Sequence, residues 1–147
     1  MAAARELKLE VKPELTAQIQ TRVSTPEMGF GPANELLSHG DGFTAIVCYN
    51  DLSAIGAIRA LKDHGLRVPE DVSVVGFDDI QSAAFHNPSL TTIRQPLNQM
   101  GTVAARILLQ RIRGQATFPD SVPIQPELMV RESTGAPSAR RVRVKRG

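Results

Sequence analysis

The apolar residues of the chain fall into short continuous runs that alternate with helical repeats. Two runs, 43–49 (FTAIVCY) and 72–77 (VSVVGF), are rich in β-branched residues and predict buried strands. The segment between them begins at Asp51, a good N-cap residue, and Gly65 suits the position after a helix end. The pattern predicts a β–α–β unit with parallel, adjacent strands. The apolar residues of its helix are Ala54, Ile55, Ile58 and Leu61.

The segments that follow extend this pattern. Residues 89–95 (SLTTIRQ) predict a further strand, and 96–113 predict the strongest helix, with Pro96 in its first turn and Gly114 at its end. Residues 122–134 (VPIQPELMVREST) predict a last extended stretch. The predicted strands are continuously apolar, which is typical of a sheet covered on both faces. The expected fold class is therefore α/β, a parallel sheet flanked by helices.

Composition narrows the class of protein. The chain has 147 residues, enough for one domain with a sizeable core, and its single cysteine, Cys48, allows no internal disulfide. The sequence has neither a signal-peptide pattern nor a run long enough to cross a bilayer, so we expect a cytoplasmic protein. Residues 135–147 are interpreted as a basic, disordered tail, although such a tail can also attract nucleic acid. Its cations are Arg140, Arg141, Arg143, Lys145 and Arg146.

Two predicted parallel strands are followed directly by polar residues. Asn50 and Asp51 follow the first strand, and Asp78 and Asp79 follow the second. Ligands of open α/β sheets bind beyond the carboxyl ends of the strands. Asn50 and Asp78 are therefore predicted to stand side by side and to bind the hydroxyl groups of a small polar ligand. Asp51 and Asp79 are interpreted as caps of the helices that follow them.

Other chemistry finds less support in the sequence. Asp51, Asp78, Asp79 and His86 could gather around Mg²⁺, as in a metal-dependent enzyme or a phospho-receiver domain. A receiver would also need a lysine at the end of a late strand, where 89–95 ends in Arg94 and Gln95. We find no nucleophile elbow and no phosphate-binding glycine loop. No catalytic residue, metal or cofactor is therefore expected.

Several motifs occur together at fixed spacing. They are an apolar strand ending in ND, A-x-G-A in the next helix, GLRVPED, SVVGFDD, PSLTTIRQP, and the closing VREST. This set, over about residues 43–134, resembles the effector-binding domain of the lac-repressor (LacI/GalR) family of bacterial transcription regulators. The resemblance implies a fold like that of periplasmic binding proteins, with two α/β lobes and a sugar or nucleoside effector between them.

The resemblance also implies roles for particular residues. The Asn of ND and the first Asp of GFDD contact the effector in the family; these are Asn50 and Asp78 here, and Gln95 is often near the effector too. The family forms homodimers that bind operator DNA through a separate N-terminal headpiece. The residues that fall where family members commonly pair are Leu52, Ile55, Arg59, Ala83 and Phe85. In the alternative interpretation, Leu52, Ile55 and Arg59 are ordinary core and surface residues.

The chain departs from the family pattern in its length. It is expected to hold residues 1–134 of a partial effector-binding domain, namely the second lobe plus one first-lobe helix at about 96–113. The headpiece, most of the first lobe and the arginine motif that usually clamps the effector are missing. We therefore expect an effector-sensing fragment of a regulator. The alternatives are a periplasmic-type sugar-binding protein and the metal-dependent enzyme or receiver domain.

Overall fold

The computed structural model describes residues 12–19, 23–39, 42–114 and 122–139, together with Glu6 and Lys8. The cations of the expected basic tail all lie outside these residues. The elements in chain order are η1 (Pro13–Leu15), α2 (Glu27–His39), β1 (Ala45–Val47), α3 (Asp51–Asp63), β2 (Ser73–Val75), α4 (Gln81–Phe85), β3 (Thr92–Arg94), α5 (Leu97–Ile112) and β4 (Glu127–Met129).

The predicted β–α–β unit is confirmed. Strands β1 and β2 are parallel, with Ile46 opposite Val74, and α3 connects them. Two parallel bridges, Val75 to Thr91 and Asp78 to Arg94, carry the pairing on to the β3 segment. Strand β4 pairs with β3 in the antiparallel direction. Strands β1, β2 and the β3 segment therefore end at the same edge, as the α/β class requires.

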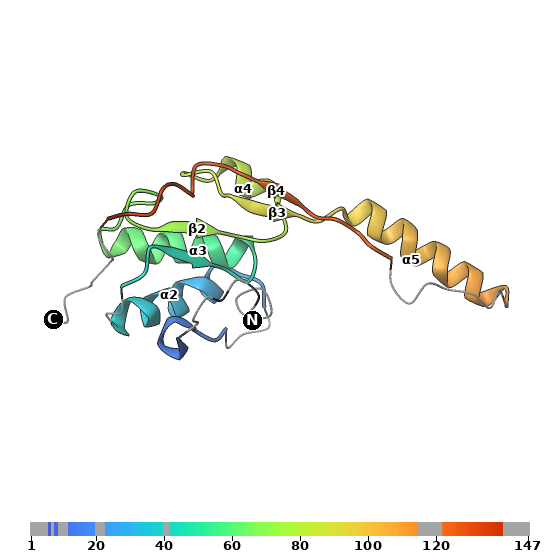
Figure 1. Cartoon of the computed structure of the whole chain (residues 1–147), viewed down its shortest axis with the longest axis horizontal. Helices are drawn as coiled ribbons and strands as arrows, with labels where there is room; N and C mark the ends of the chain where they lie inside the picture. Colours follow the sequence, from blue (N-terminus) through green and yellow to red (C-terminus); the bar gives the residue numbers. More distant parts are fainter. Residues whose placement is uncertain are drawn as a thin grey trace.

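Helices α2 and α3 cover one face of the strands (Figure 1). The main core lies between these helices and β1 and β2; its fully buried side chains include Leu37, Ile58, Leu61, Val72, Val74 and Leu90. The expectation that both faces of the strands would be covered is wrong for β1. Ile46 is buried, whereas Val47 and Tyr49 point the other way and are exposed in the described part of the chain. Continuous apolar sequence therefore does not correspond to burial on both faces here.

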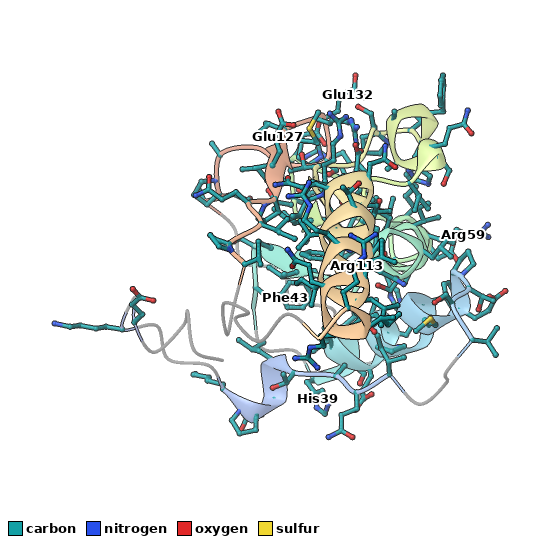
Figure 2. All side chains as sticks on the ribbon, turned by 90° about the vertical axis from the view of Figure 1, so that its right-hand side faces the viewer. His39, Phe43, Arg59, Arg113, Glu127 and Glu132 are labelled. Carbon is teal, nitrogen blue, oxygen red and sulfur yellow. The ribbon has the colours of Figure 1, made fainter. Side chains whose placement is uncertain are left out.

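Helix α5 projects away from the rest of the chain (Figure 1), and none of its residues is buried. Figure 2 looks onto its outer end, where Arg113 follows the last turn. The exposed large apolar residues of the helix are Leu97, Met100, Leu108, Leu109 and Ile112. An apolar surface of this extent is not typical of a finished monomer surface. The helix predicted at 96–113 is therefore present, but it does not contribute to the core.

Two glycines allow α2 and α3 to lie unusually close. A Cβ on Gly56 of α3 would be 1.8 Å from the carbonyl oxygen of Pro26, and a Cβ on Gly29 of α2 would be 1.7 Å from that of Ser53. Both obstacles are backbone atoms, which cannot move aside as a flexible side chain could. The N-terminal half of α3 and the start of α2 therefore meet backbone to backbone, with no side chain between them.

We expect Gly56→Ala to lower the free energy of unfolding by at least about 2 kcal/mol, because the added methyl group forces the helices apart. Gly101→Ala is the control: Gly101 lies inside α5, does not precede a proline, and has nothing within 4 Å of an added Cβ. That change should raise stability by about 0.5–1 kcal/mol through helix propensity. Urea unfolding followed by circular dichroism measures both variants. Equal stability of the two would show that the helices do not need this close contact.

Candidate functional site

The three residues predicted to bind a ligand lie at one edge of the sheet. Asn50 follows β1, Asp78 follows β2, and Gln95 follows β3. The backbone links these positions directly. The N–H of Asp51 donates to the carbonyl oxygen of Phe77 at 2.9 Å, and the N–H of Asp78 donates to that of Ile93 at 2.9 Å. The three polar side chains therefore come from neighbouring segments at one edge of the sheet. For Asn50 and Asp78, this position was predicted from their place at the ends of two parallel strands.

Asn50, and not Asp51, is the N-cap of α3. Its Oδ1 accepts a hydrogen bond from the N–H of Ser53 at 2.9 Å, and the Ser53 hydroxyl accepts one from the Asn50 N–H at 3.0 Å. This capping box uses the carbonyl oxygen of the Asn50 side chain. Asn50 is 7% exposed. Because its side-chain oxygen is used in the cap, its side-chain N–H groups are what it can offer a ligand.

Asp78 contacts Gln95 directly. The Gln95 side-chain amide donates to Asp78 Oδ1 at 2.6 Å. Asp78 is only partly buried, and its φ of +117° is unusual for a residue with a side chain. The pair offers a carboxylate acceptor beside an amide with both donor and acceptor groups. Hydroxyl groups, which both donate and accept, suit such a pair.

Asp51 has a different position from the one predicted. It is the first residue of α3, is fully buried, and accepts hydrogen bonds from the Thr92 hydroxyl at 2.5 Å and the Ile80 N–H at 2.8 Å. Burial raises its pKa; the two hydrogen bonds oppose this shift, while the nearby charges of Asp78 and Asp79 add to it. The carboxylate links α3 to β3 and to the loop before α4, so its interpretation as a helix cap is wrong.

Asp79 is also not a helix cap. Its carboxylate accepts hydrogen bonds from Arg94 at 2.6 Å and Arg131 at 2.5 Å, and the residue before α4 is Ile80, which makes no side-chain cap. Burial alone would raise the pKa of Asp79, but hydrogen bonds from the two guanidinium groups outweigh burial and lower it. The side chain, 8% exposed, therefore forms the centre of a two-arginine ion-pair cluster.

Arg131 was not identified from the sequence. It lies in the VREST motif, just after β4, and also donates to the carbonyl oxygen of Leu90 at 2.8 Å. The available signal was the presence of two adjacent carboxylates after a buried strand, since a buried carboxylate needs a cation. That argument predicts an arginine partner but does not choose among the arginines of the chain.

The described residues do not form a metal site. No group of three or more His, Cys, Asp or Glu side chains in that part of the chain is placed to hold an ion. Asp51 and Asp79 are engaged as described above, and the ring of His86 contacts the carbonyl oxygen of Pro88 at 3.1 Å. The four side chains proposed as Mg²⁺ ligands therefore point to different partners. Separately, no helix among the described residues is long and apolar enough to cross a membrane.

Two of the residues predicted to pair in a dimer, Ile55 and Arg59, line a groove between α2 and α3. The groove has a volume of about 510 Å³ and is lined by Ile55, Arg59 and neighbouring residues of α2, together with His86. Arg59 lies on the outer side of α3 (Figure 2) and pairs with Asp63 at 2.8 Å. Leu52 is partly buried.

The two predicted pairing residues of α4 differ from each other. Phe85 is 83% exposed, whereas Ala83 is fully buried in the core. The side chain of Ala83 is therefore unavailable to a partner in this monomer, and it can support the surface only from beneath.

Comparison with known proteins agrees with this geometry. A family model described as a periplasmic binding protein-like domain matches residues 2–134. The transcriptional regulator MalR of Streptomyces coelicolor is 45% identical over 125 residues, which are 85% of this chain and 36% of that protein. The crystallised complex of the transcriptional regulator CelR with cellobiose has a TM-score of 0.79 and 36% identity, over 90% of this chain and 39% of that one. The lac repressor dimer bound to operator has a TM-score of 0.71 and 37% identity, over 76% of this chain and 39% of that one.

The fold and the matched residues define the class of this protein: it belongs to the periplasmic binding protein-like domains. Within that class, it is an effector-binding domain of the LacI family of transcriptional regulators. The relatives are transcriptional regulators, the class that the sequence motifs predicted. The chain spans between about a third and two-fifths of the length of these relatives.

The ion pairs of Asp79 predict a pH dependence of stability. Because folding lowers the pKa of Asp79, the ion pairs stabilise the chain at pH values above the pKa of an unfolded Asp, about 4. This contribution is lost as the pH falls through the lower pKa of the folded state. Asp79→Asn should therefore cost about 2–4 kcal/mol at pH 7, and the difference from wild type should shrink below pH 4.

Urea unfolding of Asp79→Asn and wild type at pH 7 and at pH 3 measures this difference in stability. Asp63→Asn is the matched control, since its ion pair with Arg59 is largely exposed and should contribute no more than about 1 kcal/mol. A loss for Asp79→Asn that is small, or equal at pH 7 and pH 3, would contradict the ion-pair assignment.

Proposed function

We propose that this chain is the effector-sensing part of a LacI-type DNA-binding transcription regulator, and that the effector is a small molecule rich in hydroxyl groups, most simply a carbohydrate. The observation that carries the proposal is the meeting of Asn50, Asp78 and Gln95 at the carboxyl edge of the parallel strands, with Gln95 donating to Asp78 at 2.6 Å. Together these side chains provide amide donors and a carboxylate acceptor for hydroxyl groups. The CelR structure, solved with cellobiose, supports a carbohydrate as the first choice.

The architecture supports an effector held between two lobes. The described core, built on β1, β2, α2 and α3, forms the second lobe. Helix α5 belongs to the first lobe, and its apolar face packs against the remainder of that lobe in the full regulator. This interpretation explains why α5 has five exposed large apolar residues and no residue that is buried in the core. A DNA-binding headpiece and the rest of the first lobe then belong to the full regulator, which acts in the cytoplasm.

The mechanism that we propose is differential binding. An effector that binds one arrangement of the lobes more tightly shifts the population toward it, and that arrangement has a different affinity for operator DNA. Gln95 lies on the segment that leaves the second lobe toward α5, directly after Arg94 of β3. A ligand that contacts Asp78 and Gln95 therefore touches both the second lobe and the connection between lobes.

The regulator is proposed to act as a homodimer. The lac repressor relative was solved as a dimer on operator. On this chain, the exposed Phe85 stands next to His86, which lines the groove of α2 and α3. An aromatic side chain beside a groove that holds Ile55 is typical of a central interface contact. Leu52 and Arg59 extend the same surface along α3, with Ala83 beneath it.

The effector site is tested by Asp78→Asn. We expect this variant to bind at least about tenfold more weakly than wild type, because a charged acceptor for a ligand hydroxyl is lost. NMR shift changes and calorimetry with cellobiose, other sugars and purine nucleosides measure the affinity. Asp63→Asn, on the far end of α3, should bind as wild type does. Equal affinity of Asp78→Asn and wild type would contradict the site, and a response to nucleosides alone would contradict a carbohydrate effector.

The dimer surface is tested by Phe85→Asp. A charge at this position should shift the chain from dimer to monomer, because it would be desolvated at the interface. Analytical ultracentrifugation over a range of protein concentrations measures the association. Val130→Asp is the control, since Val130 is also highly exposed but lies after β4. Unchanged association of Phe85→Asp, or equal loss in the control, would place the interface elsewhere.

A further inference from the structure

We propose that Asp51 is the positioning residue of the effector site: it holds the segment 78–79 in the conformation that presents Asp78 to a ligand. The proposal rests on the proposed function for the role of Asp78. It assigns a task to a carboxylate that is not expected to touch the ligand itself. The argument begins with the backbone of the segment.

Asp78 and Asp79 both have positive φ, at +117° and +55°. Residues with a Cβ rarely adopt such values, because the side chain then crowds the backbone. Two in succession persist only where the surrounding structure determines the conformation. The direction of the Asp78 side chain follows from this backbone, so whatever holds the segment also sets the site.

Asp51 binds both ends of this segment. Its backbone N–H donates to the carbonyl oxygen of Phe77, just before the segment, at 2.9 Å. Its Oδ2 accepts from the N–H of Ile80, just after the segment, at 2.8 Å. Its Oδ1 accepts from the Thr92 hydroxyl at 2.5 Å, which anchors the carboxylate to β3. One residue thus fixes the two flanking peptide groups from inside the fold.

The contacts require a carboxylate at this position. Both oxygens of Asp51 face donors, the Ile80 N–H and the Thr92 hydroxyl, and the side chain is fully buried. An asparagine would turn its NH₂ group toward one of these donors, so that either the Ile80 N–H loses its acceptor or the Thr92 hydroxyl must accept in place of donating. Space for the carboxylate exists because residue 76 is glycine: a Cβ there would be 2.2 Å from Asp51 Oδ1.

Asp51 also joins the two halves of the site. Asp51 directly follows Asn50, which caps α3 and is one proposed ligand contact. The backbone N–H of Asp51 also holds Phe77, the residue before Asp78, which is the other proposed contact. The contacts of Asp51 therefore act on the separation between Asn50 and Asp78, in addition to the pairing of β1 with β2 and the ion pairs of Asp79. Loosening the contacts of Asp51 would change this separation without removing either side chain.

The test compares NMR spectra of the labelled wild-type chain with those of Asp51→Asn, Thr92→Val and Thr92→Ser. In Asp51→Asn and Thr92→Val, the amide signals of residues 77–80 should move while those of α2 stay in place. Thr92→Ser keeps the hydroxyl and should restore the wild-type positions. The Ile80 amide should follow the titration of the Asp51 carboxyl with pH in wild type and lose this response in Asp51→Asn. Because the Thr92 hydroxyl oxygen also accepts from the Asp79 N–H at 3.4 Å, Thr92→Val disturbs the segment directly as well. The pH response of the Ile80 amide, and its loss in Asp51→Asn, are therefore what distinguish a role of Asp51 from a merely structural contact of Thr92.

Asp63→Asn, the same substitution at the exposed end of α3, should leave residues 77–80 unchanged. A folded Asp51→Asn whose Asp78 and Asp79 amides keep their wild-type positions would overturn the proposal. If Asp51→Asn does not fold, the Thr92 pair decides: Thr92→Val with an unmoved segment would overturn it equally.

These measurements need no effector, so their failure is distinct from a failure of the proposed function. Where wild type binds a member of the ligand panel, Thr92→Val should weaken binding by about tenfold or more, because it removes the hydroxyl group that anchors Asp51 and accepts from the Asp79 N–H. Thr92→Ser should restore that affinity.

Discussion

The arrangement of the site depends on one buried carboxylate that accepts hydrogen bonds from two different segments. Asp51 joins the start of α3 to β3 and to the loop after β2. A carboxylate in such a position is costly unless donors satisfy it, and here both oxygens are satisfied within the chain. Its location follows from the β–α–β topology, which brings the first residue of the crossover helix to the edge where parallel strands end. The fold thus provides a place where one side chain can control the geometry of its neighbours.

Three carboxylates meet at this edge, and their partners separate their roles. Asp51 is buried and faces neutral donors, and its pKa is raised by burial. Asp79 is held by the guanidinium groups of Arg94 and Arg131, which lower its pKa. Asp78 is only partly buried and contacts the neutral amide of Gln95. Of the three, Asp78 is therefore the carboxylate best placed to exchange its partner for a ligand, because breaking a neutral contact near the surface costs less than breaking a buried ion pair.

The sequence predicted the parts of this structure that depend on periodicity and topology. The β–α–β unit, the helix at 96–113 and the common edge for Asn50 and Asp78 follow from apolar spacing and from the rule for parallel strands. The predicted roles of Asp51 and Asp79 as helix caps were wrong. A cap is predicted from neighbouring residues, whereas the actual partners, Thr92, Arg94 and Arg131, are distant in the sequence. Side-chain direction at positive φ, as in Asp78, also escapes a pattern based on regular strands. Exposure of Val47 could not be read from hydrophobicity alone.

The position of the site also explains why it suits a switch. Residues 78–79 pair with residues 94–95 twice over, through Asp78 with Gln95 and Asp79 with Arg94. The first contact can respond to a ligand, while the second is an ion pair that holds the two segments in register. The chain continues from Gln95 directly toward α5. Under the proposed function, α5 belongs to the other lobe, and a change at the first contact then acts on the connection between the lobes and not on the core. A ligand shifts such an equilibrium only by its difference in affinity between the two arrangements. Under the proposed function, the difference in affinity arises at the contact between Asp78 and Gln95. The ion pairs of Asp79 keep the strand ends in place, so that a change at this contact moves the connection and does not merely loosen the strand ends.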